Sequence, residues 1–200
     1  MIGIGKQNLI KYNAKIRKTI GALDLQWKEA FNMKKLIMFR GNSGSGKSTL
    51  AREIHKKLAR NNLLISQDTI RRDMLRAKDG KDTTALPLLE NLLEYGHNNC
   101  EITILEGILN AEWYTPLFRK AQYLYGQNIN AYYFDIPFRE TVKRHKTRPQ
   151  RGSFSSEKMK TWWNEKDYIR FIKERSFTSE MTLDDEIQIV IEDLKKDLLS

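Results

Sequence analysis

The chain has 200 residues, 40% of them hydrophobic and 30% charged, which suits one α/β domain with a core and is too short for two full domains. No apolar stretch reaches membrane-spanning length and no signal peptide opens the sequence, so we expect a cytoplasmic protein with no membrane partner. The single cysteine, Cys100, excludes an internal disulfide and a cysteine-based zinc site.

The net charge of +10 is concentrated in residues 1–33 and 139–151. A basic surface attracts nucleic acid, but it equally suits an enzyme that gathers a nucleoside triphosphate. Charge alone therefore leaves both kinds of partner open.

Residues 6–31 carry apolar side chains at helical spacing, interrupted by Gly21. We expect residues 1–33 to form an N-terminal helical extension and residues 34–200 to form the main domain. The extension is either an arm packed on that domain or a dispensable segment, and the sequence leaves both possibilities open.

The first predicted strand, residues 36–40, runs into a glycine-rich loop and then a predicted helix over 47–60. Residues 41–48 read GNSGSGKS, a complete match to the G-x-x-x-x-G-K-[ST] motif, in which backbone N–H groups at a helix N-terminus cradle phosphates. In this motif Lys47 reaches the β- and γ-phosphates, and we expect its side chain to face solvent without ligand. The Ser48 hydroxyl holds Mg²⁺. The predicted site for ATP or GTP comprises Gly41, Asn42, Ser43, Gly44, Ser45, Gly46, Lys47, Ser48 and Thr49.

The second predicted strand, residues 62–66, is followed by Asp68 and a predicted helix over 69–78. The carboxyl ends of parallel strands form the ligand crevice, so Asp68 should lie beside the glycine-rich loop. Asp68 is a candidate catalytic base for an acceptor hydroxyl, and Arg71 could steady this carboxylate or bind the acceptor substrate. The alternative is that Asp68 only caps the helix.

A predicted helix over 86–97 leads to the third predicted strand, residues 101–105, which ends in Glu106 and Gly107. An apolar strand followed by an acid is the expected form of the second metal-binding element of such folds. We therefore expect Glu106 to hold Mg²⁺ or its waters together with Ser48. The alternative is a solvated glutamate at a strand end.

The remaining pattern predicts helices over 112–125, 138–147, 156–170 and 183–198, and strands over 129–134 and, more weakly, 173–178. Thr182 is expected to cap the last helix. This alternation is typical of βα units stacked into a parallel sheet.

Arg144 and Arg148 are four residues apart, so on a helix they share one face, and Pro149 breaks the predicted helix over 138–147 just beyond. Arginines that close over a γ-phosphate neutralise charge in the transition state and exclude water. The alternative is a solvated helix face.

With these motifs in this order, residues 34–178 resemble the P-loop kinase superfamily, in particular small kinases such as the phage-type polynucleotide 5′-hydroxyl kinase domain, chloramphenicol phosphotransferase and the zeta toxins. The polynucleotide kinase has an Asp base followed by an Arg three residues later, matched by Asp68 and Arg71, and two lid arginines matched by Arg144 and Arg148. The resemblance implies an α/β, three-layer P-loop NTPase fold, with a five-stranded parallel sheet and helices on both faces. Gln67, before the base, departs from the pattern.

The motifs favour a kinase that transfers the γ-phosphoryl group of ATP or GTP to a hydroxyl group of a small molecule, a nucleotide sugar or a nucleic-acid 5′ end. Its expected catalytic residues are Lys47, Asp68, Arg144 and Arg148. The alternative is a nucleotide-dependent switch that binds nucleic acid and forms no phosphorylated product. Steeply salt-dependent nucleic-acid binding would indicate the switch.

Overall fold

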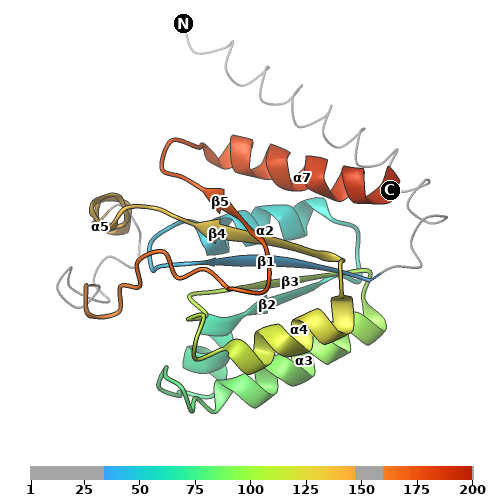
Figure 1. Ribbon diagram of the computed structural model, residues 1–200, viewed down its shortest axis with the longest axis horizontal. Coiled ribbons are helices and arrows are strands. Elements are labelled where there is room, and N and C mark those ends of the chain that lie inside the picture. Colours follow the sequence, from blue (N-terminus) through green and yellow to red (C-terminus); the bar gives the residue numbers. More distant parts are fainter. Residues whose placement is uncertain (1–33, 147–159, 200) are drawn as a thin grey trace, which may run out of the picture.

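The computed structural model describes residues 34–146 and 160–199 of the chain. Five strands form one parallel sheet in the order β2-β3-β1-β4-β5, with β1 in the centre (Figure 1). The predicted five-stranded parallel sheet is confirmed, and the glycine-rich loop follows its central strand. The strands are β1 (Lys35–Gly41), β2 (Leu63–Ser66), β3 (Ile102–Gly107), β4 (Ile129–Phe134) and β5 (Glu174–Phe177).

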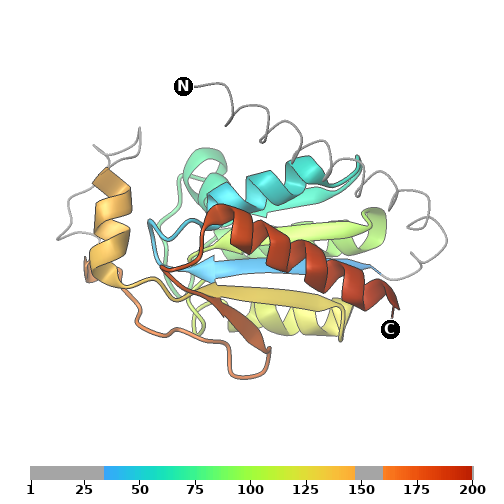
Figure 2. The same ribbon diagram turned by 90° about the horizontal axis from the view of Figure 1, so that it is seen from above.

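Helices cover both faces of the sheet, which confirms the three-layer α/β architecture. Helices α2 and α7 lie on one face, and α3 and α4 lie on the other (Figures 1 and 2). None of the described helices is both long enough and apolar enough to cross a membrane. The helical elements are α2 (Lys47–Lys57), the π-helical η1 (Thr69–Met74), α3 (Ala85–Asn99), α4 (Thr115–Tyr125), α5 (Phe138–Lys146) and α7 (Leu183–Leu199).

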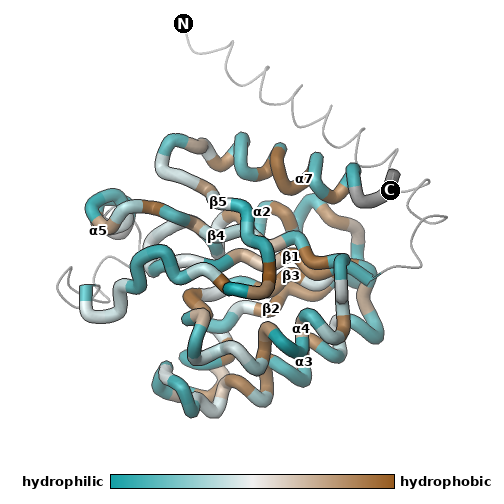
Figure 3. Tube along the Cα trace, viewed as in Figure 1, coloured by the Kyte–Doolittle hydropathy of each residue, from teal (hydrophilic) through white to brown (hydrophobic). Residues whose placement is uncertain are grey.

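The central strand β1 is buried on both faces and contributes to two hydrophobic cores. Leu36 and Met38 pack in the core under α3 and α4, whereas Ile37 and Phe39 pack in the core under α2 and α7. Figure 3 shows that the most hydrophobic residues lie along the strands and on the parts of the helices that face the sheet. A parallel strand buried on both faces reads as a continuous apolar run, which is why this strand is visible in the sequence.

Two predicted helices differ from the structure. The helix predicted over 69–78 is a π-helix that ends at Met74. Of the helix predicted over 156–170, residues 160–161 are helical and residues 162–170 are not. The backbone carbonyl groups of Asn164 and Asp167 instead accept hydrogen bonds from the side chains of Asn42 and Arg40, so tertiary contacts replace helical ones. The predicted extension over 1–33 lies outside the described residues.

The first turn of α7 is closed by reciprocal hydrogen bonds between Thr182 and Asp185. The Thr182 hydroxyl accepts from the Asp185 backbone N–H at 3.2 Å, and Asp185 Oδ2 accepts from the Thr182 backbone N–H at 2.9 Å. This arrangement satisfies two N–H groups at the helix start, and it confirms Thr182 as the cap.

A buried arginine near the end of β1 contacts three other segments of the chain. The Arg40 side chain is fully buried, with Nη1 2.8 Å from Glu174 and Nη2 3.0 Å from Asp167, and it also donates to the Leu109 carbonyl. Burial raises the pKa of both carboxyl groups, and the charge of Arg40 opposes that shift. Because each charge is paired, this cluster fixes β1, β5 and the loop after β3 relative to one another.

Candidate active site

The glycine-rich loop between β1 and α2 adopts a backbone shape that other residues rarely adopt. Gly41 has φ 137°, and a Cβ atom there would lie 2.9 Å from the backbone oxygen of Phe134 in β4. Gly46 has φ 121° and precedes α2, whose N-terminus has no side-chain cap. A helix start without a side-chain cap is a place where an anion can bind.

A small cavity of about 50 Å³ brings the loop together with the ends of two strands. It brings the predicted phosphate, metal and base residues together, and Asp68 lies beside the loop as expected for the end of a parallel strand. Its lining residues are Ser43, Gly44, Gly46, Lys47, Ser48, Asp68, Glu106, Gly107 and Ile108.

Lys47 lies folded over the loop. Its side chain was expected to face solvent, but the residue is only 6% exposed, and its Nζ donates to the Asn42 carbonyl at 2.8 Å and to Ser45 Oγ at 3.3 Å. The expectation is wrong because the loop encloses the ammonium group with oxygen acceptors. A triphosphate in the loop would offer Lys47 phosphate oxygens in place of these two.

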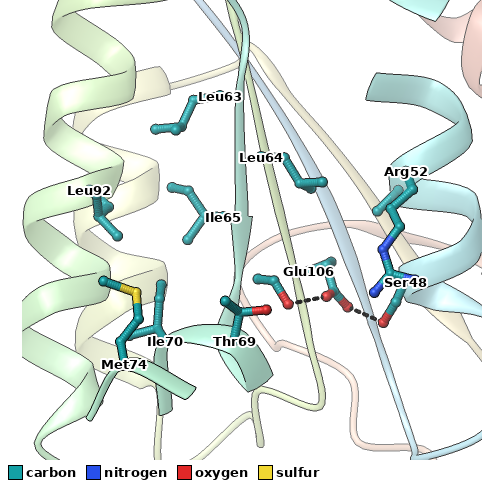
Figure 4. A pocket seen from close by; sticks show the side chains of 12 residues that line it. Ser48, Arg52, Leu63, Leu64, Ile65, Thr69, Ile70, Met74, Leu92 and Glu106 are labelled. Atoms are coloured by element: carbon teal, nitrogen blue, oxygen red, sulfur yellow. Dashed lines mark hydrogen bonds between the residues drawn. The ribbon is translucent and has the colours of Figure 1, made fainter. Parts of the chain in front are cut away.

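Glu106 is held between two serine hydroxyl groups, as Figure 4 shows. Its Oε2 accepts from Ser48 Oγ at 2.9 Å and its Oε1 accepts from Ser66 Oγ at 2.5 Å. Parallel pairing of β2 and β3 sets Ser66 opposite Glu106. Glu106 is 3% exposed, so the alternative of a solvated strand-end glutamate is wrong.

The pair formed by Ser48 and Glu106 fits Mg²⁺, which prefers oxygen ligands and is usually held by one or two protein groups together with substrate phosphates. Within residues 34–146 and 160–199 no cluster of three histidine, cysteine or acidic side chains could hold a metal ion. A serine hydroxyl and a carboxylate of this kind suit a cation that also binds a phosphate ligand.

Asp68 forms ion pairs with two arginines. Its Oδ1 accepts from Arg71 Nη2 at 2.9 Å and from Arg72 Nε at 3.0 Å, and the side chain is half exposed. Asp68 precedes η1 but makes no side-chain cap hydrogen bond, so the prediction that it only caps a helix is wrong. The structure brings Asp68 and Arg71 together, as the sequence led us to expect.

A buried polar network that sequence reasoning missed lies next to Asp68. The Gln67 side chain is fully buried, and its Nε2 donates to Tyr114 Oη at 2.9 Å and to Asp79 Oδ2 at 3.3 Å. The Tyr114 hydroxyl donates to Asp79 Oδ1 at 2.7 Å. Burial is the main cause that raises the pKa of Tyr114, and the hydrogen bond to Asp79 raises it further. The position of Gln67 before Asp68 was the only signal of this network in the sequence.

Two contacts connect the loop to the segments on either side of residues 147–159. Arg144 Nη1 donates to the Ser45 carbonyl at 2.9 Å, so this predicted arginine does reach the loop. Asn42 donates to the Asn164 carbonyl at 2.6 Å and accepts from the Asn164 N–H at 2.9 Å. Arg148 lies outside the described residues.

A larger cavity of about 340 Å³ extends from Ser48 and Glu106 along the edge strand β2 (Figure 4). It lies between α2 and α3, and most of its lining is apolar. Its apolar residues include Leu63, Leu64, Ile65, Ile70, Met74 and Leu92.

The family model for the AAA domain matches residues 36–170. The solved structures similar to this chain include an APS kinase from Mycobacterium tuberculosis in complex with AMPPNP and APS, with TM-score 0.60, 20% identity, and coverage of 82% of this chain and 98% of that chain. They also include a gluconokinase from Sinorhizobium meliloti 1021, with TM-score 0.59, 16% identity, and 83% and 93% coverage. A tunicamycin resistance protein from Deinococcus radiodurans has TM-score 0.56, 14% identity, and 80% and 95% coverage. At these identities the similarity concerns the fold. No curated protein sequence matches significantly.

Proposed function

The chain belongs to the AAA domain family, and on this premise we propose that it is a kinase that transfers the γ-phosphoryl group of ATP or GTP to a hydroxyl group. The observation that carries the proposal is the cavity in which Lys47, Ser48, Asp68 and Glu106 meet. Phosphoryl transfer requires a phosphate-binding loop, side chains that can hold Mg²⁺ and a carboxylate near the acceptor, and this cavity brings all three together.

The loop and its lysine would bind the donor nucleotide. N–H groups at the start of α2 and Lys47 would contact the triphosphate, and Ser48 with Glu106 would hold Mg²⁺. When bound, Mg²⁺ would neutralise part of the negative charge on the phosphate oxygens. Ser66 orients the Glu106 carboxylate toward Ser48 through its 2.5 Å hydrogen bond.

The acceptor hydroxyl would meet Asp68. Two guanidinium groups hold this carboxylate in place, and its half-exposed position leaves it accessible to a substrate. Asp68 would take the hydroxyl proton during attack on the γ-phosphorus. Arg144, already on the loop, and Arg148 would neutralise the charge of the transferring group.

A transfer assay tests the proposal directly. The full chain is incubated with γ-labelled ATP, Mg²⁺ and a panel of hydroxyl compounds that includes a 5′-hydroxyl oligonucleotide, and labelled products are identified by mass. We expect a labelled product with the wild type and none with Lys47→Ala, while Lys56→Ala, an exposed lysine on the same helix, serves as the matched control. Steeply salt-dependent oligonucleotide binding without any labelled product would favour the switch function instead.

A further inference from the structure

The larger cavity is a groove that wraps around the edge of the sheet. Strand β2 is an edge strand of the described sheet, and Leu63 and Leu64, whose side chains point to opposite sides of this strand, both line the groove (Figure 4). Leu63 packs against the core under α3 and α4, whereas Leu64 packs against the core under α2 and α7. The groove is therefore a seam where the margins of both cores meet, and an element seated in it would bury apolar surface of both.

Apolar side chains at the rim of the groove extend this surface. Met74 lines the groove and is 62% exposed. On α3, Tyr95 is 56% exposed and follows the groove residue Leu92 by three positions, which places both on the same side of the helix. Exposed apolar surface beside an edge strand marks a place that another element covers, because an open edge can otherwise pair with other chains.

Residues 6–31, which lie outside the described residues, have the sequence pattern of such a covering element. Six large apolar residues recur at intervals of three, four or seven positions, which places them in one stripe on a helix. They are Leu9, Ile16, Ile20, Leu23, Trp27 and Phe31. Lys11 and Lys18 fall on the opposite face of the same helix. A helix with one apolar stripe is stabilised when that stripe packs into an apolar groove.

This segment is attached close enough to reach the groove. Leu36 in β1 and Leu63 in β2 both pair with Thr103, one from each side, so they lie about 10 Å apart. The connection from residue 31 to β1 spans up to about 13 Å when extended. A helix over residues 6–31 would be about 39 Å long, whereas β2 extends over about 13 Å. The segment is therefore long enough to run the full length of the groove.

We propose that residues 6–31 form an amphipathic helix that docks in this groove and covers the edge of β2. A cavity of about 150 Å³ accepts a benzene ring, so the groove, at about 340 Å³, has room for two large side chains of the stripe. A covalently attached segment is present at an effective concentration of the order of millimolar, which favours it over a second copy of the chain. Lys47 and Asp68 line the smaller cavity instead, so docking leaves the glycine-rich loop open.

Photo-cross-linking of the full chain tests the docking. Met74 is replaced by the photoreactive amino acid benzoylphenylalanine, the protein is irradiated, and cross-linked peptides are identified by mass spectrometry. We expect position 74 to form cross-links with residues 6–31. The same replacement of Tyr123, which is 87% exposed on α4 under β1 and β4, is the control and should form none with them. Irradiation of mixed isotopically light and heavy protein shows whether each cross-link lies within one chain.

A matched pair of variants tests whether the apolar stripe holds the segment in the groove. Ile16→Gln/Ile20→Gln removes two side chains of the stripe, and Lys11→Gln/Lys18→Gln introduces the same residue on the opposite face. We expect the yield of cross-links from position 74 to residues 6–31 to fall about tenfold or more in the isoleucine variant, because the apolar surface that it would bury is lost. The lysine variant should keep the original yield. Circular dichroism checks that both variants are folded.

Three results would overturn the inference. They are the absence of cross-links from position 74 to residues 6–31, cross-links to these residues that form only between chains, and an equal yield in the isoleucine and lysine variants. Cross-links between chains would assign the groove to a second copy instead. None of these outcomes depends on the proposed kinase function, because the measurement involves no nucleotide or acceptor.

Discussion

Asp68 is the residue whose role most directly decides whether the site performs phosphoryl transfer. The substitution Asp68→Asn keeps the size of the side chain but removes the carboxylate that would take the proton. We expect kcat to fall by about 10²–10⁴-fold, with ATP affinity and melting temperature near those of the wild type, because Asp68 is half exposed and lies at the acceptor side of the cavity. Steady-state kinetics, nucleotide titration and thermal melting measure the three quantities.

Asp73 provides the control for this variant, since it is an exposed aspartate on the same helix, η1. Asp73→Asn should behave as the wild type in all three measurements. If Asp68→Asn also turned over at the wild-type rate, Asp68 could not be the base, and the proposed chemistry would need another group.

At the level of single residues, the sequence was informative where the chemistry is local. The loop motif located Lys47 and Ser48, and the ends of predicted strands located Asp68 and Glu106, because parallel strands bring their carboxyl ends to one edge. Gln67, Asp79 and Tyr114 could not be found in this way. They come from three separate segments and meet only after the chain has folded.

At the level of elements, the first turn of α7 carries a pH-dependent group. Glu186 is 4% exposed, and burial raises its pKa to about 7, although the charge of Arg144 opposes this shift. An acid whose pKa rises on folding binds its proton more tightly in the native state. The free energy of unfolding should therefore fall as pH rises from about 4.5 to about 7, by up to about 3 kcal/mol.

Glu186→Gln removes this titration. We expect the variant to lose less stability than the wild type between pH 4.5 and 7 and to be the more stable protein at pH 8, as judged by denaturant unfolding at a series of pH values. Asp184→Asn, an exposed acid in the same helical turn, should retain the wild-type pH profile. Parallel pH profiles for wild type and Glu186→Gln would contradict the assignment.

Strands were easier to predict than the chain between α5 and β5. Strands buried along their whole length are largely apolar, so β1 and β3 are plain in the sequence, whereas the edge strand β5, with the sequence ERSF, was predicted only weakly. Residues 163–170 have helix-compatible spacing, but Arg40 and Asn42 bind their backbone carbonyl groups. Such long-range contacts override local preference and leave no local trace in the sequence.

At the scale of the whole molecule, we propose that residues 34–200 form a self-sufficient kinase domain. The five strands and two hydrophobic cores of the described residues lie within this range, and the paired charges around Arg40 join its central and edge strands. A chain without residues 1–33 should therefore fold and bind ATP with an affinity close to that of the full chain. Circular dichroism and nucleotide titration check this, and insoluble or unfolded protein would show that the extension belongs to the core.

The contacts that hold the glycine-rich loop from two sides determine how much freedom it would lose on binding the proposed nucleotide. Arg144 bonds the Ser45 carbonyl, and Asn42 bonds the Asn164 backbone twice, while both partners lie outside the loop itself. A loop held in this way would lose little conformational entropy on binding a triphosphate. More of the interaction energy would therefore contribute to the affinity. Preorganisation of the loop is thus supplied by neighbouring segments as well as by its glycines.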